Sequence, residues 1–189
     1  MSPIYTKTGD EGKTSLLSGE RVTKDCISLQ TVGDVDELNA VLGVAVAQMQ
    51  KLETENEFLK ELRLYMQDVQ RDLFKVGAEL VSLQSELLKS GNIKVIGILQ
   101  VETMEKKIDA MWGEMTPLKN FILPGGSLLG AYLHEARTIC RRTERELVAL
   151  GKEKDVRPEL YKYLNRLSDF LFATARWVNF KLGEEEIIV

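Results

Sequence analysis

The chain has 189 residues, of which 44% are hydrophobic and 29% charged, so we expect one folded domain and not a disordered chain. Its formal net charge of -4 argues against binding a nucleic-acid backbone, and any phosphate contact must come from local basic clusters. It shows neither an apolar run of roughly 20 residues nor a signal-peptide core. Its two cysteines lie outside any metal-ligand pattern. We therefore expect a cytoplasmic protein that binds neither nucleic acid nor membrane.

Residues 1–33 are predicted to form an extended arm, because they lack helical periodicity and contain four glycines. The stretch from Thr6 to Ser15 combines glycines, hydroxyls and lysines. Glycine lets backbone N–H groups approach phosphate oxygens, lysine supplies charge, and hydroxyls donate further bonds. A phosphate cradle and an ordinary Gly/Asp turn both explain these residues.

The arm also contains Gly12-Lys13-Thr14, which matches the end of a Walker A loop. The full motif needs four residues between its glycines, a preceding strand and a following helix. Here two residues separate Gly9 from Gly12, and no helix obviously follows. The sequence therefore disfavours a P-loop NTPase.

Five helices are predicted after the arm, from apolar residues at three- and four-residue steps. Asp34 and Ser127 are candidate N-caps, Gly151 a terminator, and Pro158 a first-turn residue. The predicted spans are 35–50, 56–85, 95–115, 128–150 and 158–182. No convincing pair of alternating strands is present. The predicted fold is all-α: a five-helix bundle over residues 34–182 with a glycine-containing N-terminal arm, in a single domain of residues 1–189.

The fourth predicted helix places a row of basic side chains on one face: His134, Arg137, Arg141 and Arg145. Guanidinium groups beside a packed face are suited to clamping a polyphosphate. An ordinary charged face, balanced by neighbouring glutamates, explains the same spacing. His134 has no accompanying ExxH or HExxH motif, so we interpret it as structural.

Two further segments carry polar or aromatic groups beside apolar ones. Asn165 and Asp169 lie one turn apart on the last predicted helix, next to its apolar stripe. They suit either a pocket or an ordinary helix flank. The loop from Phe121 to Ser127 runs into a helix N-terminus, whose free N–H groups favour anions, or simply seals the end of the bundle.

The order of these segments is more specific than any one of them. Together they resemble the PduO-type corrinoid adenosyltransferases over nearly the whole chain, through five blocks: Thr6 to Leu16, Val35 to Asn39, Phe121 to Ser127, Leu133 to Arg145, and Tyr163 to Phe172. The resemblance implies a homotrimer of five-helix bundles with ATP and corrinoid at the subunit interfaces. It also implies the activity, transfer of the 5′-deoxyadenosyl group of ATP to the cobalt of cob(I)alamin, giving adenosylcobalamin and triphosphate.

The resemblance also implies roles for individual residues. Arg137 would pair across the interface with Asp36, and Phe121 would occupy the lower face of the corrin, leaving the cobalt four-coordinate. Asp169 would support the corrinoid site. The residues implied at ATP are Thr6, Lys7, Thr8, Gly9, Gly12, Thr14, Ser15, Lys24, Arg141, Glu144 and Asn165. The tail Glu184-Glu185-Glu186 is expected to be solvated.

The chemistry is consistent with these groups. Cob(I)alamin is itself the nucleophile, so no general base is needed, and Arg141, the lysines and Mg²⁺ would neutralise the leaving triphosphate. We predict no protein side chain as a metal ligand. The implied partners are a reductase and an adenosylcobalamin-dependent enzyme. Two alternatives remain open: a phosphotransferase or ATPase that releases ADP or phosphate, and a non-catalytic nucleotide sensor or corrinoid carrier.

Overall fold

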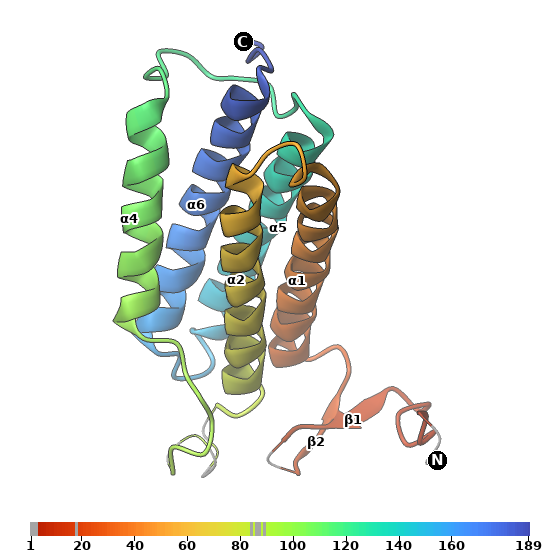
Figure 1. Cartoon of the computed structure of the whole chain (residues 1–189). Helices are drawn as coiled ribbons and strands as arrows, with labels where there is room; N and C mark the ends of the chain where they lie inside the picture. The colour runs from red at the N-terminus through yellow and green to blue at the C-terminus, as the bar shows by residue number, and fades with distance from the viewer. Residues whose placement is uncertain (1–3, 18, 84, 86–87, 89) are drawn as a thin grey trace.

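A computed structural model describes the whole chain except residues 1–3, 18, 84, 86–87 and 89. The described residues form a bundle of long helices with a small two-stranded hairpin at its N-terminal side (Figure 1). The mostly helical, five-helix fold is thereby confirmed. The elements in chain order are β1 (Lys13–Ser15), β2 (Arg21–Thr23), α1 (Ile27–Leu52), α2 (Phe58–Leu80), α4 (Ile98–Glu114), α5 (Leu128–Leu150) and α6 (Pro158–Leu182).

Helices α5 and α6 match their predicted spans because both carry strong end signals. Ser127 caps α5, its hydroxyl oxygen accepting a hydrogen bond from the Gly130 N–H at 3.0 Å. Pro158 occupies the first turn of α6, and Gly183, at φ 74°, ends that helix in the left-handed conformation.

The predicted start of α1 at Val35 is wrong, since the helix begins at Ile27. The extra turns carry the buried polar residues Ser28 and Thr31, which interrupt the apolar periodicity. The Thr31 hydroxyl is satisfied within the helix by donating to the Ile27 carbonyl oxygen at 2.8 Å. Residues 27–33 therefore belong to the bundle and not to the arm.

The other boundaries shift by less, and one element is new. Helix α2 ends at Leu80 instead of Ser85, and α4 begins at Ile98 instead of Val95. The arm folds into an antiparallel hairpin in which Lys13 lies opposite Thr23. Strands of three residues are too short to show an alternating pattern, which explains why the sequence did not reveal them.

The core lies between four pairs of packed helices: α1 with α2, α1 with α5, α5 with α6, and α4 with α6. Tyr163 and Phe170 of α6 are its largest fully buried side chains. Helix α6 packs against both α4 and α5, so it lies beside the loop that joins these two helices (Figure 1). None of the described helices has the length and apolar content to cross a membrane.

Candidate active site

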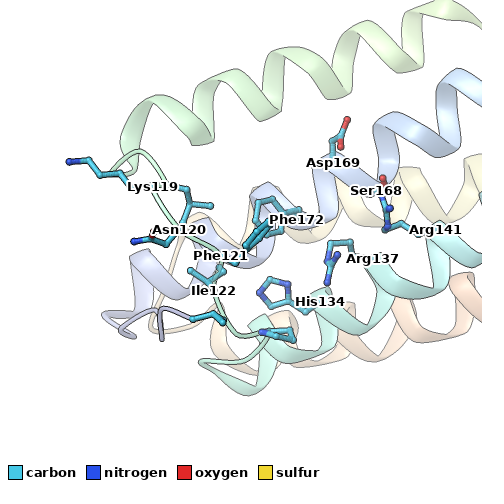
Figure 2. Close-up of a pocket in the computed structure, with 13 residues that line it drawn as sticks. Lys119, Asn120, Phe121, Ile122, His134, Arg137, Arg141, Ser168, Asp169 and Phe172 are labelled. Atoms are coloured by element: carbon cyan, nitrogen blue, oxygen red, sulfur yellow. The ribbon is translucent and has the colours of Figure 1, made fainter.

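A pocket of about 750 Å³ lies between the loop that follows α4 and the helices α5 and α6 (Figure 2). It brings together four residues predicted from separate parts of the sequence: Phe121, Arg137, Arg141 and Asp169. Phe121 comes from the loop, the two arginines from α5 and the aspartate from α6. These four residues give the pocket an aromatic ring, two positive charges and one negative charge.

Arg137 is placed to receive a ligand or a partner. Its Nε is buried and has no hydrogen-bond acceptor among the described residues, while its guanidinium carbon lies 5.9 Å from the centre of the Phe172 ring. Burial, and then the positive charge of Arg141, lower the pKa of Arg137. A buried donor without an acceptor is costly, so the Arg137 side chain favours a carboxylate or another acceptor brought from outside the chain.

His134 also lines this pocket, one helical turn before Arg137. Its side chain is 3% exposed, and neither ring nitrogen has a partner among the described residues. Burial, followed by the charge of Arg137, lowers the pKa of His134 to about 4, so the imidazole is neutral at pH 7. The prediction that His134 is structural thus misses that it faces the pocket.

A polar pair extends the site along α5 and α6. Asn165 Nδ2 donates to Glu144 Oε1 at 3.0 Å, so the two side chains implied at ATP are in contact. Asp169 accepts a hydrogen bond from Arg166 at 2.6 Å. The exposed Arg141 lies one helical turn from Glu144 and one from Arg137, so it shares a face of α5 with both. It also lines the pocket of Phe121.

The arm folds back on itself at the candidate phosphate cradle, the segment from Thr6 to Ser15. The side chain of Lys24 packs against Gly9, where an added Cβ would lie 3.1 Å from Lys24 Nζ, and the Lys24 N–H donates to the Gly12 carbonyl oxygen at 2.9 Å. Thr6 and Thr8 hydroxyls are 2.9 Å apart. Lys7 adopts φ 59°, a left-handed conformation that is strained for a lysine. Glycine, hydroxyl and ammonium groups therefore do converge here.

The remaining arm residues lie nearby in the hairpin. Thr14 and Ser15 are strand residues of β1, opposite Val22 and Arg21. Arg21, which the sequence did not single out, donates to the Thr8 carbonyl oxygen at 3.0 Å. The hairpin projects from the end of the bundle (Figure 1), and no described arm residue lines the pocket of Phe121 and Arg141. One chain alone does not join the two parts of the predicted ATP site.

Asp36 lies in a second, largely apolar groove of about 600 Å³ between the hairpin, α1 and α2. Phe74, whose side chain is 70% exposed, forms part of its wall. Among the described residues, no hydrogen bond or ion pair joins Asp36 to Arg137. The neighbouring carboxylates Asp34 and Glu37 pair instead with Arg142, which holds α1 against α5.

Glu184 and Glu185 of the tail are exposed as predicted, and Glu186 differs. Glu186 is not simply solvated, because it forms an ion pair with buried Arg176, with Nε 2.6 Å from Oε1. Val189 lines the same pocket as Phe121. The structure also adds Ser168 and Phe172 of α6, which the sequence gave no reason to separate from the core-facing residues beside them.

The described residues contain no group of three or more His, Cys, Asp or Glu side chains that could hold a metal ion. Any Mg²⁺ at this site would have to be carried largely by the oxygens of a bound polyphosphate.

Comparison with known proteins identifies the family. A family model described as cobalamin adenosyltransferase matches residues 4–178. The chain belongs to this family. A corrinoid adenosyltransferase of Citrobacter freundii is 42% identical over 176 residues, covering 93% of this chain and 94% of that protein. The Bacillus subtilis corrinoid adenosyltransferase is 39% identical over 180 residues, covering 95% and 88%.

Solved structures of the cobalamin adenosyltransferase family agree. A phenylalanine-to-alanine variant of the PduO-type ATP:corrinoid adenosyltransferase of Lactobacillus reuteri, complexed with cobalamin and ATP, superimposes with a TM-score of 0.90 at 31% identity, over 99% of each chain. An arginine-to-lysine variant of that enzyme, complexed with ATP, gives a TM-score of 0.87 at 32% identity, over 98% of this chain and 99% of that one. The chain is an ATP:corrinoid adenosyltransferase that forms adenosylcobalamin.

Proposed function

We propose that the corrinoid occupies the pocket of Phe121 and that ATP binds beside it along α5 and α6. The observation that carries this proposal is the convergence of Phe121, Arg137, Arg141 and Asp169 on one pocket. Its volume of about 750 Å³ suits part of a large ligand and part of a nucleotide. Phe121 would lie under the corrin ring, and Asp169 would support the corrinoid from α6.

In the transfer step, positive charges around ATP stabilise the leaving triphosphate. The cobalt of cob(I)alamin attacks the 5′ carbon with its electron pair, the new cobalt–carbon bond forms, and the carbon–oxygen bond to the triphosphate breaks. The negative charge that develops on the leaving oxygen is stabilised by Arg141 and by the arm lysines Lys7 and Lys24. Glu144 and Asn165, already hydrogen-bonded to each other, orient the nucleotide.

The nucleotide site is completed, in this proposal, by the arm of another subunit. The arm residues Thr6, Lys7, Thr8, Gly9, Gly12, Thr14 and Ser15 form a compact hairpin end that does not reach Arg141 in its own chain. Exposed Asp36 and the unpartnered Nε of Arg137 are complementary in charge. A homotrimer in which Asp36 of one subunit pairs with Arg137 of the next brings arm and pocket together.

The wider context follows from the reaction. A reductase must supply Co(I), and an adenosylcobalamin-dependent enzyme must consume the product. Mg²⁺ would arrive on the phosphates of ATP, because the described residues offer no metal site of their own. The two unpaired cysteines suit a reducing cytoplasm. The chain would act as one domain of residues 1–189 whose arm contacts the neighbouring subunit.

Two variants test the assignment of the two substrates. Arg141→Ala removes a charged donor to the triphosphate, and hydrogen bonds to charged groups contribute about 1.5–3 kcal/mol, so kcat/KM for ATP should fall roughly 10- to 100-fold. Phe121→Ala should leave the KM for ATP near its original value and slow the transfer. Arg71→Ala, an exposed arginine on α2 paired with Asp68, is the matched control. An Arg141→Ala enzyme as active as Arg71→Ala would remove Arg141 from the site.

A further inference from the structure

Phe121 is the key aromatic of the proposed site, yet its side chain is 86% exposed. An exposed ring gains little from packing, so the position of this side chain depends on how its backbone is held. The loop that carries it runs from Thr116 to Ser127, between α4 and α5. Phe121 lies at the pocket (Figure 2), and the contacts that hold the loop backbone decide its position there.

The C-terminal side of the loop is fastened to Asn179, a residue of α6 that is 4% exposed. Asn179 Oδ1 accepts from the Ser127 N–H at 3.0 Å and from the Ser127 hydroxyl at 2.8 Å. Asn179 Nδ2 donates to the Gly125 carbonyl oxygen at 2.8 Å. The amide therefore satisfies both its acceptor and a donor on one short stretch of loop.

Two glycines make this contact possible. A Cβ on Gly126 would lie 2.4 Å from Asn179 Nδ2, and one on Gly130 would lie 2.2 Å from Asn179 Oδ1. Gly126 also has φ 87°, which other residues rarely adopt. Gly126 of the loop and Gly130 of α5 thus allow the close approach of Asn179.

The N-terminal side of the loop is fastened to Arg176, one helical turn before Asn179 and 3% exposed. Arg176 Nη2 donates to the Thr116 carbonyl oxygen at 3.3 Å, and its guanidinium carbon lies 4.9 Å from the centre of the Trp112 ring. Both oxygens of Glu186 accept from the same guanidinium, at 2.6 Å and 2.8 Å. This bidentate pair ties the C-terminal tail to α6.

The tail then contacts the loop directly beside Phe121. The Val189 N–H donates to the Phe121 carbonyl oxygen at 3.0 Å, and the Leu123 N–H donates to the Ile187 carbonyl oxygen at 2.9 Å. Ile122 and Ile188 form an antiparallel bridge between these bonds. Phe121 is therefore held through a chain of contacts from Arg176 to Glu186, and from the tail to the loop backbone.

We propose that Arg176, Glu186 and Asn179 are positioning residues for the transfer reaction, which fix the backbone of Phe121 from both sides of its loop. This inference rests on the proposed role of Phe121 beneath the corrin. None of the three is expected to touch ATP, so weakening them should act on corrinoid turnover and not on nucleotide binding. The effect should also be largest for a corrinoid whose lower axial base has to be displaced.

The test compares Glu186→Gln with Glu185→Gln, the same change at the neighbouring exposed residue, for which no ion pair is found among the described residues. Each is assayed with cob(I)alamin and with cobinamide, a corrinoid that lacks the lower nucleotide base. We expect Glu186→Gln to lower kcat about tenfold with cobalamin, a change of about 1.4 kcal/mol in the barrier, with a smaller loss on cobinamide. The KM for ATP should stay within about twofold.

Further variants separate the possible outcomes. Glu186→Asp, which keeps the charge, should recover part of the lost rate, and Asn179→Asp, which places a carboxylate against the Gly125 carbonyl oxygen, should reproduce the cobalamin-selective loss. An equal loss with both corrinoids, or no loss beyond that of Glu185→Gln, would overturn the positioning role. Phe121→Ala is run in parallel: if it shows no cobalamin-selective loss, the proposed role of Phe121 fails instead, whatever the tail variants do.

Discussion

Replacing Gly130 by alanine tests the contact between α5 and Asn179 without altering a polar group. An added Cβ would lie 2.2 Å from Asn179 Oδ1, so the amide side chain must move away. Its three hydrogen bonds to Ser127 and Gly125 would be lost, at about 1 kcal/mol each. Alanine returns about 1 kcal/mol through its helix propensity. The net expectation is a destabilisation of about 2 kcal/mol, which corresponds to a fall in Tm of about 4–8 °C for a chain of this size.

The assay is thermal unfolding followed by circular dichroism, together with urea unfolding at pH 7. Gly113→Ala is the matched control, because Gly113 also lies in a helix, α4, and its added Cβ meets nothing within 4 Å. That variant should be unchanged or stabilised by up to about 1 kcal/mol. If Gly130→Ala proves as stable as Gly113→Ala, Asn179 does not hold the loop in the way described.

Three further predictions address other parts of the molecule. Between pH 7 and about 4.5 the unfolded chain protonates His134 while the folded chain, with its pKa near 4, does not. The contribution of His134 to the free energy of unfolding should therefore fall by about 2.5 kcal/mol, and NMR titration of this sole histidine checks the pKa from which the fall follows. Arg157→Ala leaves the fully buried Glu79 carboxylate without its partner and should cost about 3–5 kcal/mol in urea unfolding, against less than about 1 for exposed Arg71→Ala. Co-expressed Asp36→Ala and Arg137→Ala subunits should regain activity at about a quarter of their interfaces, whereas a mixture no better than either variant alone would contradict the pairing.

The fold could be predicted where a residue type has a strong conformational preference that acts within one helical turn. Ser127 and Pro158 set the starts of α5 and α6 because capping and a fixed φ act within one turn. The start of α1 could not be predicted, because Ser28 and Thr31 are buried through packing between helices and give no periodic apolar signal. The hairpin was hidden because each strand spans three residues.

The site shows the same division. Arg137 and Arg141 could be predicted to share a face, since the spacing on one helix fixes it. Phe172 and Val189 could not be placed in the same pocket, because only the tertiary packing of α6 and the tail brings them to the loop. Asn179 likewise gave no signal of its own, because only the packing of α6 against the loop brings its amide to Gly126 and Gly130.

The most direct test of the central claim is an anaerobic reaction of the purified chain with cob(I)alamin, Mg²⁺ and ATP, in which both products are identified. Attack of the cobalt on the 5′ carbon predicts one triphosphate for each light-sensitive adenosylcobalamin formed, and neither product when ATP or the corrinoid is omitted. Release of ADP or inorganic phosphate as the primary product, or binding of ATP by the folded protein without any organocobalt product, would contradict it.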